Sequence, residues 1–572
     1  AGSRTKDPDT SRSHFAFRLH QFVSKGGSVY VTAEPVDSRT IVTDYQVVLP
    51  GEPERRLYPL AFCRECGQEY LMVTRTETID GASVIARHEL RIQEEGDGYL
   101  FVSNDSEWPQ DPLSSGRLPA SWIEETASGT RVRQARRSDV PSRVHVDIDG
   151  ALDDTWAESG TIAAFIPGQL RFCLHCGVSY ESQRQAELAK VATLDTEGRS
   201  SAMTVIASSI VRTLKSLPDD EIPDEARKLL TFVDNRQDAS LQAGHLNDFV
   251  QVVQLRGAVY RAALDANPEF GLETVDLAAA VAKEINLSPA DYALAPDAID
   301  QRNADRALRG VLEYRALMDL RKGWRVTLPN LEQCGLIVID YPFSRPLADR
   351  QDQWESAHPL LQLMDPDQRN EVIRVLLDEY RRNLAIESDA LSAESFEKLR
   401  RLSRDNLKGL WALPISEPDP DPGLMILGPR GRNPSPSLVT LTGRGAYGLW
   451  LKRVLGDPLL KTTDVDDVIQ SLTDVLVKHG MLVKAKAHGM AGYRLNASAL
   501  SLRPGSGEQG APDPVRRSFE AEAAPRVVPF FRDLYRDAAA AVGSLHASEH
   551  TAQVGALDRE EREKEFREGE LP

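Results

Sequence analysis

The sequence predicts a multidomain α/β protein that combines a β-rich zinc-binding module, part of a parallel sheet, a helical insertion and a winged helix. Three observations lead to this fold class. Strand-like alternation surrounds two Cys-x-x-Cys pairs in the first third of the chain. An apolar run at residues 229–233 leads through a polar turn into a helical pattern, and two further helical patterns precede a hairpin pattern within residues 438–503. A chain of 572 residues is long enough for about three to five domains.

The composition narrows the class of protein. The formal charge of −18 argues against a generally cationic surface that coats nucleic acid, so any contact with DNA must use local basic patches. Five cysteines are too few for a disulfide scaffold in a chain of this size, and four of them form two close pairs. No apolar run reaches the length that spans a bilayer, and no signal peptide opens the chain. We therefore expect a cytoplasmic protein with no membrane partner.

Residues 1–181 are expected to form the β-rich zinc-binding module. Two segments, Phe62–Tyr70 and Phe172–Tyr180, share the template F-C-x-x-C-G-x-x-Y. The two-residue gap lets both thiolates of a pair reach one ion, and the glycine frees the backbone to turn beneath it. Four thiolates close a tetrahedral site, so we expect one structural zinc. The expected ligands are Cys63, Cys66, Cys173 and Cys176. A redox dithiol, which needs only one such pair, and buried unpaired cysteines are the alternatives.

A strand, a turn and a helix are expected between Lys228 and Phe249. The apolar residues Leu229, Leu230, Phe232 and Val233 predict a buried strand. Polar residues 234–238 follow as a turn, and a helix is expected from Ala239. Ligands collect at the carboxyl ends of strands in open α/β sheets, so this turn is where we expect chemistry or nucleic-acid contact.

The segment from Lys228 to Phe249 resembles the first strand and motif IV of the second RecA-like domain of superfamily 2 DEAD/DEAH-box helicases. A second segment, Glu549–Val554 with the charged residues that follow it up to Gly569, resembles the strand and helix before motif V in large bacterial members of the group, of the Lhr-like, repair-associated or phage-defence type. By this resemblance, residues 182–250 are the first part of the second RecA-like domain and residues 515–572 are its truncated continuation. The resemblance also implies which residues line the nucleic-acid track or the cleft between motor domains: Arg236, Gln237, His550 and Gln553.

The same resemblance implies that the chain is an internal, central fragment of an ATP-dependent DNA helicase or translocase. The remaining helicase domains, or a partner chain with the first RecA-like domain, would then supply the sites for ATP and magnesium. The chain contains no Gly-Lys dipeptide and hence no Walker A loop, so we expect no catalytic residue and no ATP hydrolysis in this chain alone. The alternative is a non-catalytic zinc and winged-helix adaptor that binds DNA or a partner protein.

Residues 251–415 are predicted to form a helical insertion. Apolar stripes predict one amphipathic helix around residues 308–318, and Asp365 with Pro366 supplies the N-cap and first-turn proline of another. The stretch Leu336–Asp340 is similar to a Walker B strand, but Tyr341 stands in place of the glutamate base. We expect only a strand that ends in an aspartate.

Two segments rich in Pro, Gly and Asp, 416–437 and 504–514, are expected to be linkers on either side of a winged helix at residues 438–503. Helices at 438–455 and 465–479 precede strand patterns between Met481 and Asn496, which is the element order of a winged helix. The unit also resembles the winged helix of Lhr-like helicases.

The winged-helix region carries a local basic edge. The residues expected to contact DNA there are Lys478, Lys484, Lys486 and Arg494, with His488 beside them. The alternative is a winged helix that packs against protein, because Asp464, Asp466 and Asp467 open its second helix.

Overall fold

The computed structural model describes the protein from residue 29 to residue 568, apart from short gaps. The residues outside the description are 1–28, 44, 79–80, 103–106, 127–128, 154–159, 181–186, 188–189, 194–198, 219, 224–225, 232–235, 298–300, 322–327, 429–434, 458, 520–524, 526, 544, 549–554 and 569–572. No helix in the described part of the chain is both long and apolar enough to cross a membrane.

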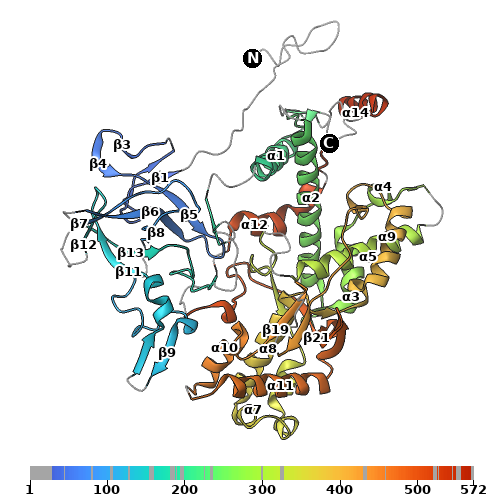
Figure 1. Cartoon of the computed structure of the whole chain (residues 1–572). Helices are drawn as coiled ribbons and strands as arrows, with labels where there is room; N and C mark the ends of the chain where they lie inside the picture. The colour runs from blue at the N-terminus through green and yellow to red at the C-terminus, as the bar shows by residue number, and fades with distance from the viewer. Residues whose placement is uncertain are drawn as a thin grey trace.

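A closed antiparallel barrel forms the centre of the N-terminal module (Figure 1). Six strands follow one another around the ring in the order β6-β7-β12-β11-β13-β8, and β8 pairs back onto β6. The sheet continues from β6 through β5, β1 and β2, and β14 pairs with β5. Closure leaves the ring itself without an edge strand. These strands are β1 (Tyr30–Val31), β2 (Ile41–Val42), β5 (Tyr58–Cys63), β6 (Glu69–Thr78), β7 (Gly81–Ala86), β8 (Asp97–Phe101), β11 (Ser142–Val146), β12 (Ala151–Asp153), β13 (Thr161–Pro167) and β14 (Val191–Ala192).

Alternation along the barrel strands creates two cores. On β6, Leu71 and Val73 face the barrel interior, whereas Tyr70 and Met72 face a second cluster that contains the four paired cysteines. On that outer side, Trp122 packs edge-on against Phe172. The remaining strands of the module form the hairpins β3 (Val48–Leu49) with β4 (Glu52–Arg56) and β9 (Ile123–Thr126) with β10 (Gly129–Val132).

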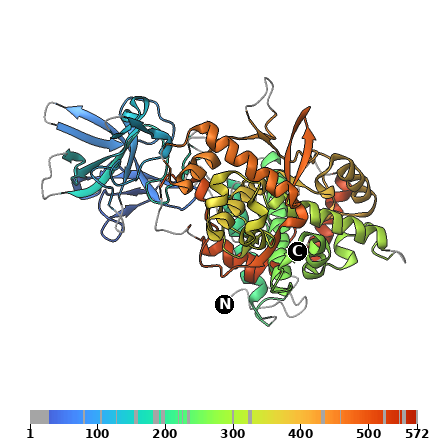
Figure 2. The same ribbon diagram turned by 90° about the horizontal axis from the view of Figure 1, so that it is seen from below.

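Helices dominate the rest of the chain, which lies beside the barrel module (Figure 2). They share one hydrophobic core that extends from α1 to Leu545, and the long helix α2 packs against α1, α3 and α13. The helices are α1 (Arg199–Ser216), α2 (Arg236–Asp265), α3 (Thr274–Ile285), α4 (Pro289–Tyr292), α5 (Arg302–Asp319), α6 (Ser344–Asp349), α7 (Pro359–Leu363), α8 (Pro366–Arg382), α9 (Ala393–Asn406), α10 (Ala446–Leu455), α11 (Thr462–Lys478), α12 (Pro529–Asp533), the π-helical η10 (Leu534–Ala538), α13 (Ala539–Gly543) and α14 (Ala556–Glu568).

Two small sheets lie within this helical body. One has the order β15-β22-β16, and the other has the order β17-β21-β18-β19 with β20 paired to β21. Their strands are β15 (Leu272–Glu273), β16 (Ile337–Asp340), β17 (Ile386–Glu387), β18 (Leu424–Leu427), β19 (Leu438–Leu441), β20 (Leu482–Ala487), β21 (Met490–Asn496) and β22 (Ser501–Pro504).

The predicted mixture of helices and strands is confirmed, but the described residues contain no RecA-like parallel sheet. Parallel pairing in this part of the chain is limited to β17 with β21 and β18 with β19. The strand expected from Leu229 is not found at residues 229–231, where Leu230 is 60% exposed, and residues 232–235 lie outside the description. The expected turn was also placed too late, because α2 already begins at Arg236 rather than at Ala239. A short apolar run does not distinguish a buried strand from a partly exposed connection.

The strongest local signals are confirmed. Helix α8 begins with the predicted Asp365 cap, which forms a capping box with Gln368, and Pro366 occupies its first turn. The strand β16 ends at Asp340 as expected, and the Asp340 carboxylate is paired with Arg374 and Arg503 rather than open for a metal. These two guanidinium groups lower the pKa of Asp340, against the opposing effect of burial.

Three of the expected connections differ from the structure. Residues 438–441 form β19 instead of the start of a helix, because glycines at 443 and 445 separate this β-branched run from α10. Strand β18 lies inside the stretch 416–437, which was expected to be a linker. The stretch 504–514, also expected to be a linker, follows the body closely: the Gly505 amide donates to the Leu336 carbonyl at 2.7 Å and the Ala511 amide to the Glu332 carbonyl at 2.9 Å.

Candidate functional site

The two cysteine pairs lie in two turns of the same geometry. In the first turn, the Gly67 amide donates to the Cys63 carbonyl at 2.8 Å, and the Cys63 amide donates to the Gln68 carbonyl at 2.8 Å. In the second turn, Gly177, Cys173 and Val178 make the same two bonds at 3.0 Å. Both glycines have positive φ, +74° at Gly67 and +72° at Gly177, a conformation that strains any other residue.

The four cysteine sulfurs converge on one point in the outer core of the barrel module. Their Sγ atoms all lie within 4.8 Å of one another, all four side chains are buried, and none forms a disulfide. The Sγ atoms of Cys66 and Cys173 are 3.7 Å apart. A tetrahedral ion with metal–sulfur bonds of about 2.3 Å places its sulfurs about 3.8 Å apart. The cluster is therefore close enough to hold a metal ion, and four sulfurs leave no coordination position open for a substrate.

Two tyrosines cross between the turns to reach the sulfurs. The Tyr70 hydroxyl, from the first template, lies 3.0 Å from the Cys173 Sγ, and the Tyr180 hydroxyl, from the second, lies 3.0 Å from the Cys63 Sγ. The Leu174 amide donates to the Tyr70 oxygen at 3.0 Å, so the phenol hydrogen is left to donate to the sulfur. Burial and the nearby sulfurs raise the pKa of both tyrosines well above the usual value, which keeps them protonated donors.

Contacts within the cluster shift the pKa values of its thiols in opposite directions. Burial alone would raise the pKa of the Cys173 thiol, but hydrogen bonds from the other three cysteines and from Tyr70 outweigh burial and lower this pKa. The hydrogen bond to Cys173 is the main cause that raises the pKa values of Cys66 and Cys176. A divalent cation that bound here would replace the remaining thiol protons, so metal affinity falls as the pH is lowered.

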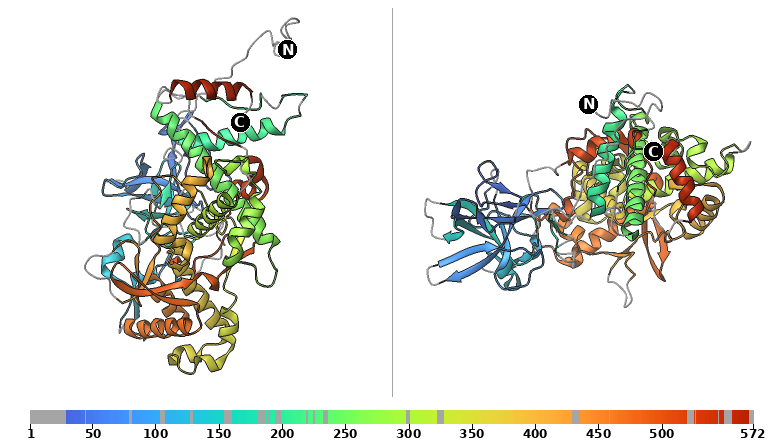
Figure 3. Two further views of the ribbon diagram at one scale, coloured as in Figure 1. Left: turned by 90° about the vertical axis from the view of Figure 1, so that its right-hand side faces the viewer. Right: turned by 90° about the horizontal axis from the view of Figure 1, so that it is seen from above.

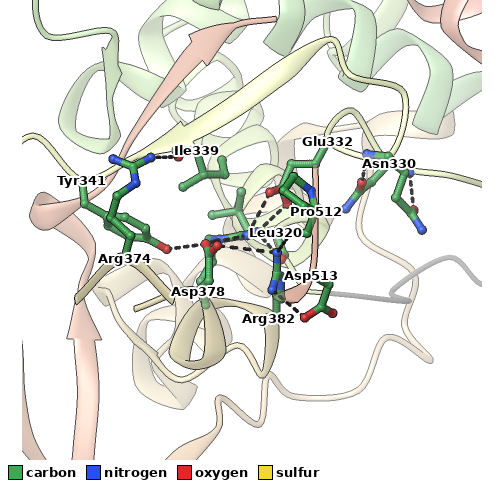
Figure 4. Close-up of polar contacts among 12 residues, drawn as sticks. Leu320, Asn330, Glu332, Ile339, Tyr341, Arg374, Asp378, Arg382, Pro512 and Asp513 are labelled. Atoms are coloured by element: carbon green, nitrogen blue, oxygen red, sulfur yellow. Dashed lines mark hydrogen bonds and ion pairs between the residues drawn. The ribbon is translucent and has the colours of Figure 1, made fainter. Parts of the chain in front are cut away.

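A buried ionic network is centred on helix α8 (Figure 4). Two of its members, Glu332 and Arg382, line the same pocket as the ligands Cys66 and Cys176. The fully buried Arg381 guanidinium bonds Glu332 at 2.5 and 2.9 Å and Asp378 at 3.0 Å. The hydroxyl of Tyr341 donates to Asp378 at 2.9 Å. Arg382, the residue after Arg381, pairs with Asp513 at 3.1 Å and donates to the Pro512 carbonyl at 3.0 Å. Each charge of the network has an oppositely charged partner, so the network holds α8 against the segments that supply Glu332 and Asp513.

The residues expected in the helicase motifs are only partly described. Arg236 and Gln237 are the first two residues of α2, and nothing further is described for them; His550 and Gln553 lie outside the described residues. Their surroundings nevertheless come together. The Asn247 side chain exchanges two hydrogen bonds with the Ala547 backbone, at 2.9 and 2.8 Å, across 300 positions of sequence. Close to the start of α2, the Lys228 ammonium contacts the carbonyl and ring of Phe566 on α14. In Figure 3, α14, drawn in dark red, lies at the same end of the helical body as α1 and α2.

The basic residues of the winged-helix region divide into two groups. Lys484 and Lys486 are exposed on one face of β20, and Lys478 is exposed in the last turn of α11. By contrast, the Arg494 side chain is only 14% exposed, pairs with Glu387 at 3.0 Å and donates to the Gly423 carbonyl at 3.0 Å. These contacts give Arg494 a packing role, and its expected contact with DNA stays a prediction. His488 lies in the hairpin turn, with its Nε2 3.1 Å from the Asp421 carboxylate.

The exposed face of α11 is acidic. Asp467 and Asp474 are exposed along it, and Asp464 and Asp466 are half-buried in its first turns. Carboxylates repel the phosphates of DNA, so the acidic face of α11 is unsuited to contact DNA. The exposed lysines of this region lie on β20 and at the end of α11.

Comparisons of the chain with protein-family models, with curated proteins and with solved structures return no match.

Sequence patterns located the four sulfurs but missed two sets of residues. The tyrosines at 70 and 180 stand at the same offset in both templates, and that repetition was the available signal for their role. No comparable signal marks residues 516–519, which contact the second cysteine turn from the far end of the chain.

Replacement of a single ligand tests the four-cysteine site. We expect Cys63→Ser and Cys173→Ser to reduce bound metal from about one ion per chain towards none and to lower the free energy of unfolding of the outer core that contains the cysteines by about 3–5 kcal/mol. Elemental analysis and thermal unfolding measure the two effects. Cys334→Ser is the matched control, because Cys334 is buried in the helical body away from the cluster. Equal metal content in all three variants would reject the site.

Removal of a single tyrosine hydroxyl tests the hydrogen bonds from Tyr70 and Tyr180 to the cysteine sulfurs. We expect Tyr70→Phe and Tyr180→Phe to retain metal but to bind it about 10–100-fold more weakly, because each loses a hydrogen bond to a coordinating sulfur. Competition with a chromophoric chelator measures the affinity. The matched control is Tyr99→Phe, since the buried Tyr99 hydroxyl bonds Glu187 at 3.1 Å instead of a sulfur. An affinity equal to that of the control would show that the hydroxyls do not act on the metal.

Proposed function

We propose that the chain is the central portion of an ATP-dependent superfamily 2 DNA helicase or translocase, to which it contributes nucleic-acid binding and part of the second motor domain. The observation that carries this proposal is the contact between the two segments that resemble helicase motifs. A motor domain interrupted by large insertions requires its two parts to rejoin in space. The pairing of Asn247 with Ala547, and of Lys228 with Phe566, supports that requirement.

The packing around these contacts supports the same proposal. Helix α2, which begins within the first segment and extends beyond it, lies along α13 and η10, which precede the second. At their contact Gly257 faces Ala539, where an added side chain would be only 2.2 Å from the Ala539 Cβ. Because these helices are in close contact, the residues between α2 and η10 begin and end at neighbouring positions, as the residues of an insertion do.

For the metal we propose zinc in a structural role. Four thiolates in a closed tetrahedral arrangement are typical of structural zinc, and soft sulfur ligands disfavour magnesium and calcium. When bound, zinc would supply a cross-link between the two turns and no reaction chemistry. The residues that would hold it are Cys63, Cys66, Cys173 and Cys176, with Tyr70 and Tyr180 donating to the sulfurs.

For DNA we propose contact through the β20 strand of a winged helix. Helices α10 and α11 and the β20–β21 hairpin follow one another in winged-helix order. Lys484 and Lys486 lie on one exposed face of β20 and can contact phosphates, whereas the acidic face of α11 argues against insertion of that helix into a groove. ATP closure and hydrolysis belong to motor elements that the chain does not contain, since it has no Walker A loop.

The second candidate is a non-catalytic zinc and winged-helix adaptor that binds DNA or a partner protein. The lack of a RecA-like parallel sheet in the described residues favours it. The two candidates make different predictions for the helicase-like segments. In a helicase or translocase these segments contact DNA, whereas in an adaptor they do not.

Charge reversal on β20 tests the DNA contact. We expect Lys484→Glu with Lys486→Glu to weaken DNA binding at least tenfold at low salt and to reduce the slope of log K against log salt by about two, since each lysine neutralises about one phosphate. Fluorescence anisotropy of labelled DNA across a salt series measures both quantities. The matched control is Lys398→Glu with Lys408→Glu, which makes the same charge change at exposed positions on and after α9. Equal weakening in both variants would place the contact elsewhere.

Photo-crosslinking separates the motor from the adaptor. We expect a benzoylphenylalanine at position 237 or 553 to cross-link to single-stranded DNA, because motif IV and the segment before motif V line the track in the resembled helicases. The same probe at Leu294, an exposed residue of the helical insertion, is the control. Cross-links from neither position 237 nor position 553, with DNA still bound through β20, would favour the adaptor.

A further inference from the structure

Four consecutive residues, Arg516 to Phe519, attach the helical body to the second cysteine turn. The Ser179 amide donates to the Arg516 carbonyl at 2.7 Å, and the Ser518 amide donates to the Gly177 carbonyl at 2.6 Å. Between them, Val178 and Arg517 form an antiparallel bridge. The segment thus adds to the backbone edge of the turn in the way that a peptide adds to a strand.

Side chains of this segment reach both cysteine turns. The Arg516 guanidinium pairs with Glu65 at 2.9 Å, and Glu65 lies between the ligands Cys63 and Cys66. The Phe519 ring meets the Phe172 ring edge-on, at 6.3 Å between centroids, beside Cys173. The Arg117 guanidinium lies over the Phe519 ring, 4.5 Å from its centroid. The contacts with Glu65 and Phe172 depend on where the two turns hold their backbone.

The segment is anchored to the body at its other end. Immediately before it, Arg382 on α8 holds Asp513 and the Pro512 carbonyl, and α8 is fixed by the buried network of Arg381 with Glu332 and Asp378 (Figure 4). The Arg453 side chain of α10 donates to the Arg517 carbonyl at 3.1 Å. One end is therefore tied to rigid helices and the other to the metal site.

The junction beside the segment is not closely packed. A cavity of about 110 Å³ separates the cysteine turns from the body, lined by Arg64, Cys66 and Cys176 on one side and by Glu332, Arg382 and Asp513 on the other. A void at a junction reduces dispersion contacts, so the directed hydrogen bonds and the Phe519 contact contribute to the attachment beside it.

We propose that a metal ion at the four-cysteine site controls the docking of residues 516–519, and that the site is a metal-dependent clamp between the barrel module and the helical body. The bound ion fixes the two turns and so presents the Gly177 carbonyl and the Ser179 amide to the segment. Without the ion, no metal–sulfur bonds join the two turns, and the edge that receives the segment is lost. The barrel retains its own closed core, which contains none of the cysteines. The proposal is independent of the helicase function.

Hydrogen exchange of the full chain, loaded with zinc and then stripped by a chelator, tests the clamp. The Ser179 and Ser518 amides should exchange at least tenfold faster in the stripped protein. Barrel amides such as that of Val84, which donates to Gly150, and body amides such as that of Leu495, which donates to Ala385, should keep their protection. Unchanged exchange at Ser518 would overturn the proposal. Loss of protection throughout the barrel would also overturn it, because the metal would then support the module's fold rather than its docking.

A docking variant tests the segment without removal of the metal. Arg516→Ala with Phe519→Ala should retain one zinc per chain, show at least tenfold faster exchange at Ser179, and give a larger radius of gyration in solution scattering. The matched control, Arg532→Ala with Phe530→Ala, removes the same side-chain types from α12 and should behave as the unmodified protein. Full protection at Ser179 in the docking variant would show that residues 516–519 are not the attachment.

Discussion

The convergence of four sulfurs from two remote turns is the constraint on which the outer core of the barrel module, and its junction with the helical body, depends. Each turn closes with its own pair of backbone bonds, but neither can surround an ion alone. The ligands Cys66 and Cys173 are 107 positions apart, so the site closes a long loop that includes most of the barrel. The crossed tyrosines strengthen this mutual dependence, because each turn supplies the hydrogen bond that stabilises the first sulfur of the other.

A second constraint organises the helical body. The Arg256 guanidinium of α2 is fully buried and bonds both carboxylate oxygens of Asp319 on α5, at 2.9 and 2.6 Å, as well as the Tyr535 hydroxyl of η10 at 2.7 Å. A buried charge without partners would cost several kcal/mol, so these elements must hold their relative positions. The same interaction holds α2, which begins within the first helicase-like segment, against η10, which precedes the second.

Prediction from sequence succeeded where the chemistry is local. The spacing of each Cys-x-x-Cys-Gly turn, the Asp365 cap and the β16 strand each depend on a few neighbouring residues, and the structure has all of them. Prediction failed where partners lie far away. Residues 438–441 become a strand because β18 pairs with them, and the stretch 504–514 is ordered because Leu336 and Glu332 receive its amides. For Arg494, the sequence did not reveal its distant partners, Glu387 and the Gly423 carbonyl.

The amino-acid sequence by itself determined the ligand types, the shape of each cysteine turn and the caps and faces of the main helices, because backbone conformation and side-chain spacing are set within a few residues. Only the tertiary structure decided that the two turns share one centre and that each tyrosine contacts a sulfur of the other turn. It also decided that residues 516–519 and Asn247 contact residues hundreds of positions away in the sequence. Those contacts arise from the packing of whole sheets and helices, whose relative positions no short stretch of sequence encodes.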